Sequence, residues 1–169
     1  MRRRRVDLSR WLGLLVLAAA AASRCGSSST TPPSPLPPQC DATLWSHVYD
    51  PTRLHVSAPC QTVTGVIAAT PHASDDGDMD MPLALDPPYT NLLNNGNTTS
   101  LGGHLNVEAI CQATIHPDVP AAVPACGSFH GSVFIPPAGA HVQVTGSYVL
   151  DTNHGWMEIH PATAITLLR

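Results

Sequence analysis

The sequence predicts an all-β fold, a small closed barrel of five strands, in the part of the chain that follows an N-terminal leader. Residues 141–168 contain two runs in which apolar and polar residues alternate, and the turn-forming stretch 151–155 separates them. Alternation with a period of two is typical of a half-buried strand, and Asn, Asp and Gly accept the backbone angles of tight turns. Three further runs of this kind lie within residues 61–112, which gives the count of five.

The first 24 residues have the organisation of a secretion signal. Residues 2–5 are all arginine, and residues 11–22 form the apolar run that follows them in such signals. This run is shorter than the roughly 20 apolar residues that a membrane-spanning helix needs. We therefore expect residues 1–24 to be a signal peptide.

Residues 22–29, with the sequence Ala-Ser-Arg-Cys-Gly-Ser-Ser-Ser, resemble a bacterial lipoprotein signal, in which a cysteine carries a lipid. Cys25 would be that cysteine, although Arg24 stands where the lipoprotein family has a small residue. Plain secretion after cleavage at Ala22 is the alternative. Residues 25–39 are rich in Ser, Thr and Pro and cannot bury enough apolar area to fold, so they are predicted to be a disordered tether.

Removing the leader changes the charge of the chain. Six of the eight basic residues precede Cys25, which leaves only Arg53, Arg169 and eleven of the twelve carboxylates, and the sequence has no lysine. The net charge of the remainder is 2 − 11 = −9 with neutral histidines. Proteins that bind nucleic acids need Lys and Arg to contact phosphates. We therefore expect a ligand other than a nucleic acid.

Four cysteines remain once Cys25 is set aside, and an even number in an exported chain predicts two disulfides. Four cysteines allow three pairings. We expect Cys40–Cys60 and Cys111–Cys126, because each pair closes a short segment that contains proline. The alternative is that these cysteines are buried free thiols.

The folded part of the chain is predicted to cover residues 40–169 and to begin with one or two helical turns. Asp50 ends these turns, because a residue before proline is disfavoured in the helical region. The first strand is expected at residues 61–69, where Gly65 predicts a sharp bend or a bulge.

The second strand is expected at residues 78–86, with its four apolar side chains on one face. Pro82 favours an edge position or a bulge there, because proline has no N–H to donate to a neighbouring strand. Residues 87–103 are predicted to form a long loop, and residues 104–112 the third strand.

The remaining elements follow from proline content and from alternation. Residues 115–137 contain five prolines and are predicted to be a loop, within which residues 128–135 are a candidate for a short additional strand. The fourth strand is expected at residues 141–150 and the fifth at residues 156–168.

Two motifs and this strand order resemble the oligonucleotide/oligosaccharide-binding (OB) fold. The motifs are T-V-T-G-V at residues 62–66 and V-Q-V-T-G-S-Y at residues 142–148, and the resemblance covers residues 62–168. It implies a five-stranded Greek-key barrel similar to exported, lipoprotein-like bacterial domains, and it implies no activity. The chain departs from the pattern where a proline-rich loop replaces the helix that often follows the third strand.

The C-terminal hairpin offers a candidate metal site. His154, Glu158 and His160 have the same parity, so a continuous strand would place them on one face, with neighbours about 7 Å apart. Imidazole and carboxylate groups suit Zn²⁺ or a similar ion such as Cu²⁺, and His104 or Glu108 would supply a further ligand. The alternative is that both histidines only make hydrogen bonds within the hairpin and the turn that follows it.

The function expected from these patterns is a non-enzymatic, membrane-tethered binding module outside the cytoplasm. No nucleophile motif or phosphate-binding loop is found in the sequence, which favours binding over catalysis. The partner of the module would be a cell-envelope protein, a glycan or a small ligand. A divalent metal is the one cofactor considered, and a metal-dependent hydrolase is the alternative function. In an OB barrel the second and third strands and the rim loops bind the ligand, which gives these candidates: Asp78, Asp80, Tyr89, His104, Asn106, Glu108 and Trp156.

Overall fold

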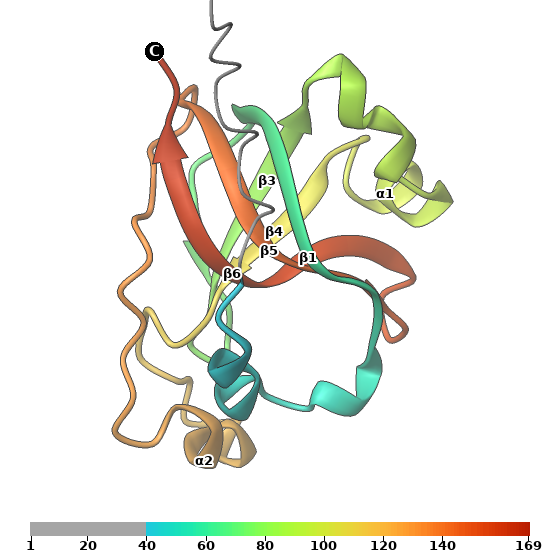
Figure 1. Cartoon of the computed structure of the whole chain (residues 1–169). Coiled ribbons are helices and arrows are strands. Elements are labelled where there is room, and N and C mark those ends of the chain that lie inside the picture. Colours follow the sequence, from blue (N-terminus) through green and yellow to red (C-terminus); the bar gives the residue numbers. More distant parts are fainter. Residues whose placement is uncertain (1–39) are drawn as a thin grey trace, which may run out of the picture. The chain divides into compact units, whose positions relative to one another are not determined.

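The structure is a computed structural model that describes residues 40–169. The predicted signal peptide, the tether and Cys25 lie outside the described residues. The described part is mostly β, as the sequence predicts (Figure 1). Its strands are β1 Leu54–Ile67, β2 His72–Ala73, β3 Met79–Leu85, β4 Leu105–Ala109, β5 His141–Asp151 and β6 Trp156–Leu167.

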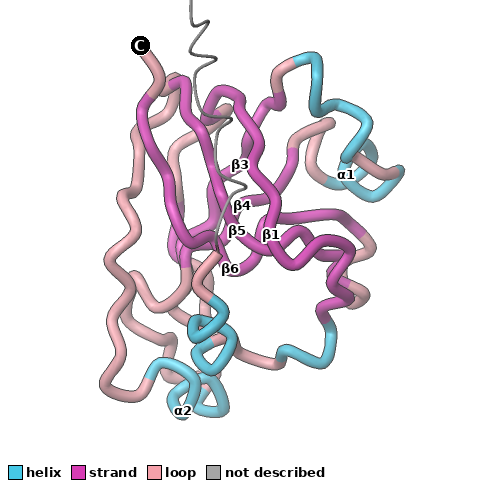
Figure 2. The backbone as a smooth tube through the Cα atoms, viewed as in Figure 1, coloured by secondary structure: helices cyan, strands magenta, loops and turns pink. Residues whose placement is uncertain are grey.

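The strands, drawn in magenta in Figure 2, belong to one mixed sheet. Its six strands have the order β1-β5-β6-β4-β3-β2. The pair β4–β6 is parallel, and the other pairs are antiparallel. The end of β1 also pairs with the end of β3. The pairings β1–β5, β5–β6, β6–β4, β4–β3 and β3–β1 therefore form a closed series. The two-residue strand β2 adds a sixth strand to the five that were expected.

Strand β1 is longer than expected and irregular. It begins at Leu54 rather than at residue 61, and its register against β5 shifts on both sides of Ala58. These bulges lie before Gly65 and not at it. Gly65 instead pairs with both β5 and β3, and a Cβ atom there would collide with the carbonyl oxygen of Ala84. Glycine is therefore needed where the two strands approach β1 most closely.

Pro82 is accommodated in a different way from the one predicted. Strand β3 is not an edge strand, since it pairs with β4 over Met79–Leu83. On its other side β3 pairs with β2 through residues 79–80 and with β1 through residues 83–85. Pro82 lies between these two pairings, where its missing N–H leaves no ladder hydrogen bond broken.

The main hydrophobic core lies on the face that β1, β3, β4, β5 and β6 share. It is built from alternate residues of these strands, because alternate side chains point to the same side of a sheet. Its fully buried members include Val63, Met81, Leu83, Val107 and Ile159. A second, smaller core lies beside η1 Ala42–His47 and contains Val48 and the disulfide-bonded Cys111.

Both predicted disulfides are present. Cys40–Cys60 joins the segment before η1 to β1, and Cys111–Cys126 closes the loop after β4. On the loop-entropy model, a bridge that closes about 15 residues stabilises a fold by about 3 kcal/mol. Two disulfides indicate an oxidising, extracytoplasmic environment. Among residues 40–169, the helices are too short and polar to cross a membrane.

Two segments that were expected to be loops contain helices. Residues 87–103 form η3 Pro87–Leu92 and α1 Asn95–Ser100, and residues 115–137 contain η4 Pro120–Ala122 and α2 Val123–Cys126. No strand lies at residues 128–135. Helix α1 is stabilised by a capping box, in which Asn94 and Asn97 each accept a hydrogen bond from the other's backbone N–H. One capping interaction offsets the low helix propensity of this short segment.

Candidate functional site

Five polar side chains share one face of the surface that β3, β4 and β6 form. The register places Asp80 opposite Glu108 and Asn106 opposite Glu158. His160 follows two residues after Glu158 and therefore points to the same side. The intervening residues of each strand point into the main core. The alternation of the sequence thus places four acids or amides and one imidazole together.

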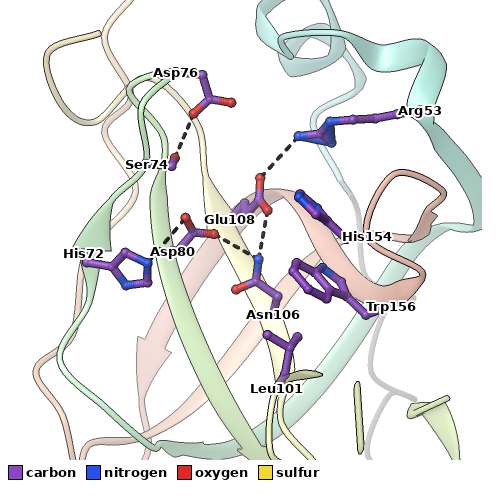
Figure 3. Close-up of a pocket in the computed structure, with 10 residues that line it drawn as sticks. All are labelled: Arg53, His72, Ser74, Asp76, Asp80, Leu101, Asn106, Glu108, His154 and Trp156. Carbon is purple, nitrogen blue, oxygen red and sulfur yellow. Dashed lines mark hydrogen bonds and ion pairs between the residues drawn. The ribbon is translucent and has the colours of Figure 1, made fainter. Parts of the chain in front are cut away.

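This polar face borders a pocket with a volume of about 320 Å³ (Figure 3). Asp80, Asn106 and Glu108 lie between two walls. The segment from His72 to Asp76, which connects β1 to β3, forms one wall. The other wall is formed by the turn between β5 and β6 and by the first residue of β6, Trp156.

The amide of Asn106 fixes two of the carboxylates in the pocket. Its Nδ2 donates to Asp80 Oδ1 at 2.9 Å and to Glu108 Oε1 at 2.8 Å. Both amide hydrogens are therefore used, and the two carboxylates lie side by side. Carboxylates that share a donor in this way present their remaining oxygens in a defined direction.

An aromatic pair forms the wall at the start of β6. The rings of His154 and Trp156 are stacked with their centroids 4.3 Å apart. His154 Nδ1 lies 2.9 Å from Asp151 Oδ2, and the indole N–H of Trp156 donates to Glu158 Oε2 at 3.0 Å. Both rings are therefore anchored at their polar ends by buried carboxylates.

Arg53 is the one Lys or Arg side chain of the described region that contacts this cluster. It is the last residue of η2 Pro51–Arg53, and its side chain is only 10% exposed. Its guanidinium lies 3.1 Å from Asp151 Oδ2 and 3.9 Å from Glu108 Oε2. These ion pairs connect the segment before β1 to strands β4 and β5.

His160 is fully buried at the base of the cluster. Its Nδ1 lies 2.7 Å from Glu108 Oε2 and 3.1 Å from Glu158 Oε1. Its Nε2 lies 3.6 Å from Asp78 Oδ2, which is beyond hydrogen-bond distance. The other oxygen of Asp78 accepts the backbone N–H of Cys111 at 2.8 Å. Among the described residues, neither His160 Nε2 nor Asp78 Oδ2 has a hydrogen-bond partner.

Burial and the neighbouring charges shift the pKa values in this cluster in opposite directions. Burial, and then the charge of Asp76, raise the pKa of Asp78 to about 7. Burial also raises the pKa of Glu108, and the His160 ring opposes this shift. Burial alone would lower the pKa of His160, but Glu108 and Glu158 raise it well above its usual value. Burial alone would raise the pKa of Glu158, but the bonds from His160 and Trp156 outweigh it and lower that pKa.

The structure brings together two of the three residues of the predicted metal site. Glu158 and His160 are in contact, whereas His154 contacts Asp151 and Trp156. The parity argument does not extend to His154, because residues 152–155 form a turn and β6 begins at Trp156. His160 instead belongs to a group with Asp78 and Glu108, whose donor atoms lie within 4.8 Å of one another.

Only four of the seven predicted ligand-face residues line the pocket. Asp80, Asn106, Glu108 and Trp156 line the pocket, whereas Tyr89 packs against the main core. His104 is not among the lining residues, and Asp78 is buried below the pocket. Asp78, Asn106 and Glu108 belong to the predicted ligand face but are buried rather than open to solvent, and the side chain of Arg53 contacts Glu108 there.

Several residues of the site were not predicted from the sequence. Arg53 and Asp151 are the most important of them, because they form the closest ion pair with a guanidinium in the described region. Asp151 was assigned only a role in the turn, and Arg53 was assigned none. The scarcity of basic residues could have pointed to Arg53, since a single Arg in an acidic domain has many carboxylates available to pair with.

A comparison with models of protein families finds no match for this chain, and a comparison with curated proteins finds no relative. The resemblance to OB-fold domains therefore stays a prediction that rests on motifs and strand order. The interpretation of the site rests on its own side chains, since a fold alone does not determine a function.

Proposed function

We propose that residues 40–169 form a non-enzymatic binding module that takes a small positively charged ligand, or the charged end of a larger one, into the pocket. The observation that carries the proposal is the composition of the pocket. Asp76, Asp80 and Glu108 supply carboxylates, and the stacked rings of His154 and Trp156 border the same space. Carboxylates and aromatic faces together are the groups that recognise ammonium and guanidinium ions.

The strand order supports an OB-like Greek-key barrel as the scaffold of this site. In an OB fold the face of the second and third strands binds the ligand, together with the loops that join strands one to two and four to five. The corresponding parts here are β3, β4, the segment 68–78 and the turn 152–155. Residues from all four parts line the pocket. The parallel pairing of β4 with β6 and the return of β3 to β1 are consistent with this barrel.

Binding fits this pocket better than turnover does. Ser74 is the one hydroxyl among the residues that line the pocket, and it donates to Asp76 Oδ1 at 2.7 Å rather than to a histidine. A serine without an adjacent base is a weak nucleophile. The carboxylates Asp80 and Glu108 are both bonded to the Asn106 amide, which suits a fixed recognition surface.

The proposed location is the outer face of the cell envelope. Support comes from the two disulfides, which suit an oxidising compartment, and from the leader with Cys25. A lipid on Cys25, the first residue of the tether 25–39, would place the pocket outside the membrane within reach of envelope components. Radiolabelled palmitate incorporation that Cys25→Ser abolishes would test this tether.

Titration calorimetry with a matched pair of probes tests the proposed ligand class. Choline and its neutral isostere 3,3-dimethyl-1-butanol are titrated into the full chain, purified from an oxidising compartment. We expect choline to bind more tightly, with an affinity that falls as salt is added, because salt screens charge attraction. A second titration with a neutral oligosaccharide examines the glycan alternative.

A double variant, Asp76→Asn with Asp80→Asn, removes two charges but keeps the oxygen that accepts the hydrogen bond from Asn106. We expect choline to bind about tenfold more weakly to it, which corresponds to about 1.4 kcal/mol. Asp118→Asn is the control, since Asp118 is 88% exposed and outside the pocket lining. Equal binding of the neutral isostere, or an equal loss in the control, would rule out the proposal.

A further inference from the structure

Two buried polar atoms face each other below the pocket. Asp78 Oδ2 and His160 Nε2 are 3.6 Å apart, and neither has a hydrogen-bond partner among the described residues. The Asp78 side chain is 3% exposed and that of His160 is 0% exposed. A buried polar atom without a partner costs about 1–3 kcal/mol, so native structures rarely keep a facing pair of them without a ligand or an ion.

The other ring nitrogen of His160 determines what Nε2 can do. Nδ1 lies 2.7 Å from Glu108 Oε2 and 3.1 Å from Glu158 Oε1. The hydrogen bond of Nδ1 is with Glu158 Oε1, and a carboxylate oxygen accepts, so Nδ1 carries a proton and donates it to Glu158. In the neutral ring the lone pair then lies on Nε2 and points toward Asp78. A histidine whose Nδ1–H is bound by a carboxylate is the arrangement that orients metal-ligating imidazoles in proteins.

We propose that Asp78, Glu108 and His160 bind a divalent transition-metal ion, with Zn²⁺ as the best fit. Their donor atoms come from the segment before β3, from β4 and from β6, and all lie within 4.8 Å of one another. One imidazole and two carboxylates form a mixed nitrogen and oxygen set, which suits Zn²⁺ better than Ca²⁺ or Mg²⁺, since those ions take oxygen ligands.

The surroundings of the three residues suit an ion with an open coordination position. Glu108 also lines the pocket, so a water molecule or a ligand group in the pocket would reach an ion beside it. Three protein ligands and one exchangeable position are the usual arrangement of a non-structural zinc site. Glu158 would orient the imidazole without binding the ion, and Asn106 would orient Glu108.

This proposal shares Glu108 with the pocket proposed above for an organic ligand, but the two proposals are tested on different residues. The choline test concerns Asp76 and Asp80, which are not among the three metal ligands. The proposed metal site also differs from the one predicted from the sequence, which included His154. Both arrangements include His160, but they make opposite predictions for His154, and that difference gives the experiment its control.

The experiment begins with the metal content of the full chain, purified without a histidine tag and without chelator. Mass spectrometric elemental analysis is expected to find about one Zn²⁺ per chain. After removal of metal with EDTA, Co²⁺ is titrated as a spectroscopic probe. Co²⁺ that is bound in a protein site with a low coordination number has visible absorption bands. The same chain should bind Zn²⁺ in competition with Co²⁺.

Three variants then locate the ion. His160→Gln should lose the visible Co²⁺ band and the retained Zn²⁺, whereas His154→Gln should keep both. Glu158→Gln should weaken Zn²⁺ binding about 10- to 100-fold, because it removes a group that orients a ligand. The circular dichroism spectrum and the oxidised state of all four cysteines serve as the folding check for each variant.

Three results would overturn the proposal. The first is a wild-type chain that retains no metal and shows no Co²⁺ band. The second is equal binding by His160→Gln, and the third is a loss that occurs in His154→Gln instead. If His160→Gln does not fold, the Co²⁺ spectrum of the wild-type chain and the Zn²⁺ affinity of Glu158→Gln decide between the ion and an imidazolium held by carboxylates.

Discussion

Arg53 occupies an unusual position for a charged residue, since it is nearly buried and faces several carboxylates. Asp151 and Glu108 lie within 4.0 Å of its guanidinium, and both are buried. Burial alone would lower the pKa of Arg53, but Glu108 and Asp151 outweigh it and raise that pKa. The side chain is therefore charged in the folded domain, and its charge offsets part of the repulsion among the carboxylates of the site.

Replacement of Arg53 should destabilise the domain strongly. Arg53→Met keeps much of the apolar stem but leaves Asp151 and Glu108 buried without the guanidinium, which typically costs about 3–5 kcal/mol. Urea denaturation of the chain in a buffer with EDTA measures this loss. Arg169→Met is the matched control, because Arg169 is exposed at the C-terminus, and it should stay within about 0.5 kcal/mol of wild type. A loss below about 1 kcal/mol in Arg53→Met would contradict the expectation.

At the scale of elements, a single buried asparagine joins helix α1 to strand β6. Asn97 Nδ2 donates to the carbonyl oxygens of Met157 at 2.8 Å and His104 at 3.0 Å. Its Oδ1 accepts the backbone N–H groups of Met157 and Asn94. All four hydrogen-bonding positions of the amide are thus used. Asn97 begins an Asn-Thr-Thr glycosylation motif, but a side chain with 0% exposure accepts no glycan in the folded domain.

We expect Asn97→Ala to lower the free energy of unfolding by at least about 3 kcal/mol, because it leaves several buried backbone groups without partners. Asn95→Ala provides the comparison, since Asn95 lies two residues away in the same helix and is exposed. Chemical denaturation of both variants gives the difference. Similar stabilities for the two variants would show that the amide network contributes little.

The disulfide Cys111–Cys126 fixes the loop that follows β4, next to the second core. The double variant Cys111→Ala with Cys126→Ala should lower stability by about 3 kcal/mol, the value expected for a closed loop of about 15 residues. Thermal unfolding followed by circular dichroism, with and without a reductant, measures the effect. The wild-type chain should respond to the reductant more than the double variant does. An unchanged melting temperature in both would contradict this role.

The strand boundaries that the sequence predicted best are those of the last two strands. They agree with β5 and β6 to within one residue, because the turn residues 151–155 separate the two strands. The first half of β1 was missed because bulges and Pro59 interrupt its pattern. Helix α1 was missed because Asn, Gly and Thr have low helix propensity, and its stability comes from a cap and from Asn97.

The candidate site was predicted less well than the strands. The alternation placed Asp80, Asn106 and Glu108 on one face, but it could not show that a distant arginine contacts Glu108. Arg53 and Glu108 are brought together by the pairing of strands far apart in the chain, and single-sequence periodicity carries no information on such contacts. The prediction that His154 shares a face with Glu158 and His160 was wrong, because the turn at residues 152–155 interrupts the alternation of the strand.

At the scale of the whole molecule, the ring of strand pairings returns to β1 at a polar junction. Asp86 follows β3 and accepts hydrogen bonds from the Thr64 hydroxyl of β1 and from His141 Nε2 at the start of β5. These bonds, the one from Thr64 foremost, lower the pKa of Asp86 below its usual value of 3.8. One partly exposed carboxylate therefore links β1, β3 and β5 near the point where β1 pairs with both other strands.

The stability that Asp86 contributes should depend on pH in a defined direction. A carboxyl group whose pKa is lowered by folding stabilises the fold above its unfolded pKa, and this contribution is lost as pH falls through the lower folded value. Asp86→Asn should therefore melt at a lower temperature than wild type at pH 7, and the difference should shrink below about pH 4. Asp118→Asn should show no difference at either pH. A constant difference for Asp86→Asn down to pH 2 would contradict this assignment.

The near burial of Arg53 has a consequence for proteolysis. Trypsin cleaves after Lys and Arg, and between residue 40 and the terminal Arg169 the chain offers it only Arg53. The protease must extract this side chain from its contacts with Asp151 and Glu108 before it can cut. Digestion within residues 40–169 would thus occur at one bond, at a rate set by local opening beside the pocket, and any molecule that occupies the pocket should slow that cut.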